Sequence, residues 1–279
     1  MAAFINTNLA SLNAQRNLSA SQSGLATSLQ RLSSGMRINS SKDDAAGLAI
    51  ADRMSSQIRG NNVAIRNAND GISLAQTAEG AIGKMGESLQ RMRELAVQAR
   101  NTTNGTDDKA ALDTEFQALA SEVTRVATGT NFNGKKVLGA DAGTAFDFQV
   151  GAGTSTEDTI SITTKNLTTD TTITDATGSA VTGNTAAIGI TIDKIDAALK
   201  TINSERATYG ATQNRFESVV SNLQTSVEAT SASRSRIMDT DFAAETASLT
   251  RGQILQQAGT AMLAQANSLP NGVLALLRG

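Results

Sequence analysis

Apolar residues recur in alternating steps of three and four over one long stretch of the chain, between Ile192 and Ile237. The unbroken series is Ile192, Ile195, Leu199, Ile202, Arg206, Tyr209, Gln213, Phe216, Val220, Leu223, Val227, Thr230, Arg234 and Ile237. This heptad spacing is typical of a helix that packs lengthwise against other helices. Such a helix would be about 70 Å long at 1.5 Å per residue, which predicts equally long partners.

A second heptad pattern supplies one of these partners and continues to about Val97. It begins after Asp43 and Asp44, which stand where an N-cap and a first-turn acid are expected. The polar residues Asn61 and Glu79 fall within its apolar face. We interpret them as residues that fix helix register at some cost in stability.

A third, shorter helix is predicted between a capping segment at Thr106–Asp108 and Gly129, and Asn133-Gly134 then signals a turn. From about 139 to 189 the chain is rich in Gly, Thr, Ser and Ala. Phe146–Val150 and Ile160–Ile162 alternate with period two, which predicts short strands in hairpins. The Thr-rich residues 163–185 fit either a hairpin or a surface loop, and 188–192 fit either a last strand or the start of the long helix.

Both ends of the chain carry amphipathic helical patterns with few charges. We expect the antiparallel inner helices to bring the two ends together with their apolar stripes facing each other. The outer faces, rich in Ala, Ser and Gln, would then suit packing against further copies. Pro270 interrupts the C-terminal pattern, which resumes beyond it, so we expect a kinked helix there. The predicted assembly residues are Ile5, Leu9, Leu12, Leu25, Leu29, Leu32, Leu255, Met262, Leu269, Val273 and Leu276.

The predicted fold is mainly α: a long antiparallel coiled-coil bundle with paired terminal helices and a small β-hairpin region. Its predicted parts are an N-terminal helix in 1–42, a helical segment in 43–138, a hairpin and loop segment in 139–191, a long helix in 192–238 and a C-terminal helix in 239–279.

The composition makes several classes of function and partner improbable. The chain has no Cys and no His, which argues against thiol or His-based catalysis and the usual zinc sites, and we expect no enzyme activity, metal or cofactor. Its net charge of −2, without a basic patch, makes nucleic acid an unexpected partner. We expect no cleaved secretory signal, because the first 15 residues lack a basic segment and a continuous apolar run. We also expect no membrane insertion.

Several long motifs resemble bacterial flagellin. They occur in the family's order and cover nearly the whole chain: Leu32–Met54, Ala68–Gln76, Arg91–Gln98, Asn131–Gly134, Phe148–Gly151, Gln213–Phe216, and the tail from Ser235 onward. The short central region resembles a flagellin without large outer domains. The resemblance implies a secreted, extracellular structural subunit that polymerises into the flagellar filament for swimming motility.

The resemblance also implies partners. Flagellins leave the cell through the flagellar type III export apparatus, with an export chaperone holding the C-terminal helical segment. Their terminal segments fold and pack on assembly, and the filament meets hook-associated junction proteins and a cap protein. Many flagellins are recognised by a vertebrate Toll-like receptor, and Arg91, Leu95 and Glu115 match the family positions of that contact. On spacing alone, Leu95 would pack on the third helix, and the two charges would be ordinary solvated residues.

Two alternatives remain at this point. A hook–filament junction protein shares the plan of paired terminal helices, and a secreted coiled-coil receptor ligand would need no assembly. An enzyme is the weakest hypothesis. Expression level and self-polymerisation into long filaments separate the leading hypothesis from a junction protein, and an assay for turnover tests the enzyme hypothesis.

Overall fold

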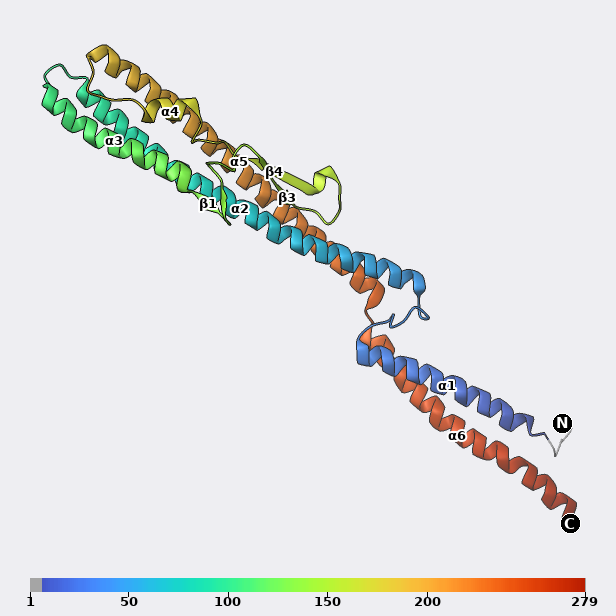
Figure 1. Cartoon of the computed structure of the whole chain (residues 1–279). Coiled ribbons are helices and arrows are strands. Elements are labelled where there is room, and N and C mark those ends of the chain that lie inside the picture. Colours follow the sequence, from blue (N-terminus) through green and yellow to red (C-terminus); the bar gives the residue numbers. More distant parts are fainter. Residues whose placement is uncertain (1–6, 279) are drawn as a thin grey trace. The chain divides into compact units, whose positions relative to one another are not determined.

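The computed structural model describes residues 7–278, and the side chains of residues 7–268. Ile5 therefore lies outside the described residues, and Leu269, Val273 and Leu276 lie where the helical backbone alone is described. The described part contains six α-helices: α1 (Leu9–Ser34), α2 (Ala45–Ala99), α3 (Thr106–Gly129), α4 (Thr171–Thr177), α5 (Thr185–Met238) and α6 (Phe242–Arg278) (Figure 1). A mainly helical fold is thereby confirmed.

Four short strands form two antiparallel pairs in the same part of the chain: β1 (Asn131–Phe132) with β2 (Lys135–Lys136), and β3 (Ala145–Gln149) with β4 (Thr159–Thr163). The β1–β2 turn contains Asn133 and Gly134 at positive φ (48° and 79°), as the Asn-Gly signal predicted. In the second pair Ala145 lies opposite Thr163, and Gln149 lies opposite Thr159. A 3₁₀ turn, η1 (Thr156–Asp158), precedes β4.

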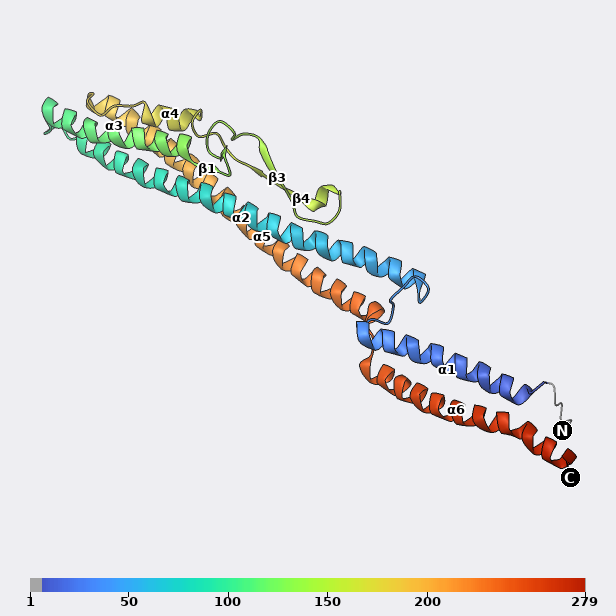
Figure 2. The same cartoon turned by 60° about the horizontal axis from the view of Figure 1, so that its bottom comes forward.

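The chain divides into two compact units. Unit 1 combines the N-terminal part up to Ser56 with the C-terminal part from Ala229, and unit 2 is Gln57–Glu228. In unit 2, α2 and α5 run side by side, with α3 and α4 along them, in both views of the molecule (Figures 1 and 2). In unit 1, α1 and α6 lie side by side.

Side-chain caps set several of the helix ends. The Asn8 side chain accepts a hydrogen bond from the Ser11 N–H, and Gly35 ends α1 at φ 70° with its N–H bound to the Arg31 carbonyl. The Asp44 carboxylate accepts from the Gly47 N–H at 2.9 Å, so Asp44 caps α2 one position later than the predicted N-cap, and the first turn contains no acid.

The core of unit 2 is a continuous apolar layer between α2, α3, α5 and the β3–β4 hairpin. Phe216 is fully buried, and its ring meets that of Phe148 edge to face with centroids 5.6 Å apart. Asn67 on α2 donates to the Gln149 carbonyl at 3.0 Å, so the hairpin is tied to α2 as well as to α5. The ring contact with α5 and the hydrogen bond from α2 together hold the β3–β4 hairpin on the two long helices.

Two elements differ from the sequence-based expectation. The Thr-rich segment contains the short helix α4, whose N-cap Asp170 accepts from the Thr172 N–H at 2.9 Å. Residues 188–192 are helical, because α5 begins at Thr185, seven residues before the predicted start. The Asn184 side chain accepts from the Ala187 N–H at 2.8 Å and so caps this early start.

Candidate assembly surface

The antiparallel pair of α1 and α6 combines small and polar residues with a few leucines along its seam. Ser11, Ser28 and Ala266 are buried along the seam, at 6%, 7% and 7% exposure. Leu18 lies against Gly259, and Leu25 lies against Gly252. Hydrogen bonds close one end of the pair: the Asn8 amide donates to the Ala266 carbonyl at 2.8 Å, and the Ser11 hydroxyl donates to Asn267 Oδ1 at 2.8 Å.

Large apolar side chains lie outside this seam. We call seven residues the exposed apolar set; they are between 48% and 65% exposed: Leu9, Leu12, Leu29, Phe242, Ile254, Leu255 and Met262. This corrects the expectation that the apolar stripes face each other and leave small-residue faces outside. The helices approach where Gly252 and Gly259 leave room for leucines of α1, and the exposed apolar set points away from the seam.

The predicted assembly residues therefore separate into two groups. Leu9, Leu12, Leu29, Leu255 and Met262 belong to the exposed apolar set. Leu25 and Leu32 are half-buried within unit 1. The side chains of the remaining four fall outside the described residues. Phe242 and Ile254 were missed, although both are apolar residues in the C-terminal helical pattern.

A groove of about 390 Å³ runs between α1 and α6, and we call it the terminal groove. Leu255, Ala258 and Met262 line its α6 side, and Gly259 and Leu18 meet beneath it. Its α1 side is small or amide-bearing: Ala10, Asn13, Ala14, Asn17 and Ser21. A shallow apolar groove edged by amides suits the side chains of another helix.

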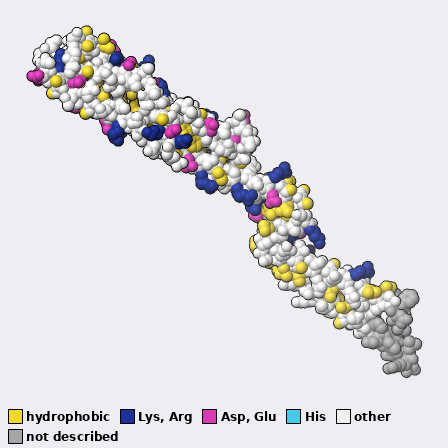
Figure 3. Space-filling model, viewed as in Figure 1, with side chains coloured by type: hydrophobic (Ala, Val, Ile, Leu, Met, Phe, Trp, Pro, Cys, Tyr) yellow, Lys and Arg dark blue, Asp and Glu magenta, His cyan; other side chains and the backbone are white. Residues whose placement is uncertain are grey.

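Charge is sparse around the groove. Within Leu9–Ser34, Arg16 and Arg31 are the charged residues, and residues 242–268 contain Glu245 and Arg251. Figure 3 shows hydrophobic side chains on the surface of this helix pair with few charged ones among them. Exposed apolar area with little charge is typical of protein-interaction surfaces.

Unit 2 brings together two of the three residues predicted for receptor contact. Arg91 on α2 forms ion pairs with Glu115 on α3 at 2.9 Å and with Glu94 at 3.0 Å. The hydrogen bond with Glu115 is the main cause of a raised pKa of Arg91. Leu95 is 1% exposed and belongs to the core of unit 2. In this conformation Leu95 supports the α2–α3 surface from beneath.

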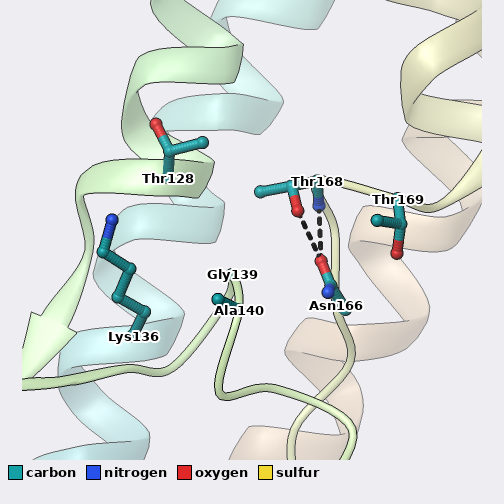
Figure 4. Close-up of a pocket in the computed structure, with 7 residues that line it drawn as sticks. All are labelled: Thr128, Lys136, Gly139, Ala140, Asn166, Thr168 and Thr169. Carbon is teal, nitrogen blue, oxygen red and sulfur yellow. Dashed lines mark hydrogen bonds between the residues drawn. The ribbon is translucent and has the colours of Figure 1, made fainter.

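A polar pocket of about 340 Å³ lies where α3 ends beside the loops around 139 and 168 (Figure 4). Asn166 Oδ1 accepts from both the N–H and the hydroxyl of Thr168, at 3.0 and 2.7 Å. Lys136 extends toward Thr128 in Figure 4, and none of the seven lining residues is acidic. The hydrogen bonds within the pocket hold a loop, and the lining offers no acid–base pair.

Within the described residues, no group of His, Cys, Asp or Glu is arranged to hold a metal ion. In the part of the chain that the structure describes, no helix is both long and apolar enough to cross a membrane.

Comparison with known proteins identifies relatives over the whole length of the chain. Family models of the bacterial flagellin N-terminal and C-terminal helical regions match residues 5–142 and 192–277. The chain is 46% identical to a flagellin of Halalkalibacterium halodurans, over 99% of this chain and 100% of that protein. It is 35% identical to flagellin B of Vibrio cholerae, over 99% and 100% of the two chains.

A crystal structure of Bacillus cereus flagellin is 33% identical, covering 57% of this chain and 88% of that one, with a TM-score of 0.49. The matches support a flagellin and give no support to a junction protein or a separate receptor ligand. The two family models together match most of the sequence, and the relative from Halalkalibacterium halodurans aligns from end to end. This chain belongs to the bacterial flagellin family.

Proposed function

We propose that this short flagellin, a structural subunit of the bacterial flagellar filament, assembles by burying its exposed apolar set and terminal groove against other copies of the chain. The observation that carries the proposal is the placement of Leu255 and Met262, which line the groove and are 49% and 65% exposed. Covering one large apolar side chain stabilises a contact by roughly 1.5–3 kcal/mol. Repetition along a polymer multiplies that gain with each subunit.

The proposal includes folding of the terminal helices on assembly. The α1–α6 seam buries few large side chains, and an isolated pair of amphipathic helices is marginal in water. Contacts with neighbouring copies would supply the missing apolar burial. Removal of residues 270–279 is therefore expected to abolish polymerisation while unit 2 stays folded.

Electron microscopy after addition of a polymerisation-promoting salt tests the proposal directly. Met262→Glu places a charge in the terminal groove and should prevent long filaments. Gln253→Glu places the same charge on an exposed position of α6 that does not line the groove, and should assemble normally. Circular dichroism checks that unit 2 remains helical in both variants. Normal filaments from Met262→Glu would contradict assembly through the groove.

Further partners follow from the same exposed surface. We propose that an export chaperone covers α6 before secretion, since this helix carries four members of the exposed apolar set. The subunit is then secreted and becomes part of the extracellular flagellum, where junction and cap proteins contact the ends of the filament. Co-purification of the chain with such a chaperone, lost on Phe242→Glu and Ile254→Glu, tests this proposal.

Recognition of the free subunit by a vertebrate Toll-like receptor is a separate proposal. It is supported by the exposed Arg91, 2.9 Å from Glu115 on the neighbouring helix, which presents alternating charges across α2 and α3. Leu95 contributes by holding this surface in place, because its side chain is buried.

A further inference from the structure

Two glycines of α6 pack against two leucines of α1, and both the glycines and the leucines are seven residues apart in the sequence. A Cβ atom at Gly259 would lie 3.1 Å from Leu18 Cδ1, and a Cβ atom at Gly252 would lie 3.3 Å from Leu25 Cδ1. These separations are shorter than ordinary van der Waals contact, so each leucine occupies the space that a side chain on α6 would need. Both contacts are internal to unit 1.

The alignment set by these two contacts also matches a large residue with a small one at two further levels. Continued along both helices, it places Ser28 level with Leu249, and Ala14 level with Leu263. All four side chains are buried or half-buried. Close packing requires that the side-chain volumes at each level fit the distance between the helices. Each of these four levels therefore combines one bulky residue with one small residue.

A slip of half a heptad would destroy this match. It would set Leu25 level with Leu249, or Leu18 level with Leu263 when the slip is in the other direction. Two leucines cannot occupy the space of one leucine and one glycine without pushing the helices apart. Size complementarity therefore excludes the half-heptad alignments.

A slip of a full heptad preserves much of the size match, and a different set of contacts opposes it. At one end Ser11 binds Asn267 at 2.8 Å, and at the other end Arg31 and Glu245 approach to 3.8 Å. Both contacts would be lost if the pair moved by seven residues. Polar groups at the ends thus distinguish alignments that the apolar residues leave equivalent.

We propose that Gly252 and Gly259 are positioning residues that fix the register of α1 against α6, with the polar contacts at the two ends selecting the correct heptad. The inference rests on the proposed assembly function, because the register decides which residues of each helix line the terminal groove. A shifted pair would present a different surface to neighbouring subunits. The glycines fix the register because the absence of a side chain leaves the space that Leu18 and Leu25 fill.

Disulfide trapping measures the register without background, because the chain contains no cysteine. Ser11→Cys with Asn267→Cys reports the observed alignment, which the Asn8–Ala266 and Arg31–Glu245 contacts still favour in this variant. Ser28→Cys with Gln256→Cys reports an alignment shifted by one heptad. In the full-length chain under polymerising conditions, the first pair should form an intrachain disulfide and the second should not. Electron microscopy of the same samples records filament formation separately.

Gly259→Leu should lower the yield of the Ser11–Asn267 cross-link by about tenfold, through overpacking against Leu18. Adding Leu18→Ala should restore it, because the bulky and small partners are then exchanged. Gly24→Leu adds the same side chain to α1 at an exposed glycine with open space, and should leave the yield unchanged. Gly259→Leu also raises helix propensity, so a model based on propensity alone predicts the opposite change.

An unchanged yield in Gly259→Leu, or no recovery in the double variant, would overturn the register inference. If that happens while the parent chain forms filaments, assembly through the groove still stands. If the parent chain cross-links in the observed register but forms no filament, the proposed assembly fails and the register inference survives.

Discussion

The side-chain amide of Gln213 on α5 donates a hydrogen bond to the carboxylate of Glu79 on α2, with 2.8 Å between Nε2 and Oε2. Both side chains are half-buried within the seam between the two long helices. A polar pair inside a coiled-coil seam specifies register at the expense of stability, because apolar residues would pack there more favourably. In unit 2 this polar pair therefore helps to fix the register of α5 against α2.

Removing one partner of this pair should cost more than replacing both. Glu79→Ala leaves the Gln213 amide without its acceptor, and we expect the free energy of unfolding to fall by about 1–2 kcal/mol. The double variant Glu79→Leu with Gln213→Leu should be at least as stable as the parent chain. Urea unfolding of the three proteins, followed by circular dichroism, checks the order. A double variant less stable than Glu79→Ala would contradict the assignment.

Gly71 and Gly80 on α2 form a matched pair for testing the core of unit 2. A Cβ atom at Gly71 would lie 2.7 Å from Phe216 Cζ, whereas one at Gly80 would meet no atom within 4 Å. Gly71→Ala should therefore lower the free energy of unfolding by about 1–3 kcal/mol through overpacking. Gly80→Ala should raise it by up to about 1 kcal/mol, because alanine favours the helix. Equal effects from the two substitutions would show that Phe216 has room to move.

Two carboxyl groups near α4 have pKa values shifted in opposite directions, so substitutions at the two positions should change stability with pH in opposite ways. Burial raises the pKa of Glu205 above its ordinary value, an effect that Lys165 opposes and Asp170 reinforces. The pKa of Asp170 is lowered: its burial acts in the other direction, but the ion pair with Lys165 at 2.6 Å and the hydrogen bonds from Thr172 outweigh it.

A raised pKa means that ionised Glu205 is less stable in the folded chain than in the unfolded one. Glu205→Gln should therefore increase stability at pH 7, and the gain should disappear as the pH falls through the pKa of Glu205 toward 4.5 and below.

The lowered pKa of Asp170 has the opposite consequence for stability. Asp170→Asn should decrease stability at pH 7, and this loss should shrink as the pH falls below 3.8. Unfolding midpoints in urea between pH 3 and pH 7 provide the measurement. A pH-independent effect of either variant would contradict the corresponding assignment.

Measuring both receptor activation and stability for substituted subunits should distinguish residues that contact the receptor from residues that support the contact surface. Arg91→Ala removes an exposed charge, and we expect about tenfold weaker activation with an unchanged unfolding midpoint. Leu95→Ala should also weaken activation, but together with a loss of about 2–5 kcal/mol of stability, because this leucine is 1% exposed. Arg125→Ala on α3, with a 71% exposed side chain, is a charge-matched control. Full activation by a stable Arg91→Ala protein would remove this residue from the contact.

The sequence predicted the long helices because their pattern repeats over many turns, so that local ambiguities average out. It left 188–192 undecided, since five residues that alternate with period two also fit one face of a helical turn. Helix α4 was missed because threonine favours strands, although the N-cap Asp170 was a readable start signal.

The orientation of the terminal leucines was harder to predict. A strong apolar residue is usually assigned to the seam within the chain. Here Leu18 and Leu25 do pack against glycines in the seam, but Leu9, Leu12 and Met262 remain outside. Periodicity identifies a helix face that becomes buried, but it does not say whether the partner belongs to the same molecule. In a filament subunit both kinds of burial operate, and the residues must be divided between them.

The hydrogen bond from Asn8 to Ala266 joins residues 258 positions apart. Helix α1 precedes unit 2 along the chain and α6 follows it. A chain shortened to before Phe242 cannot form the α1–α6 pair, whatever the state of its central helices. Assembly through the terminal groove would therefore select subunits in which both helices are present.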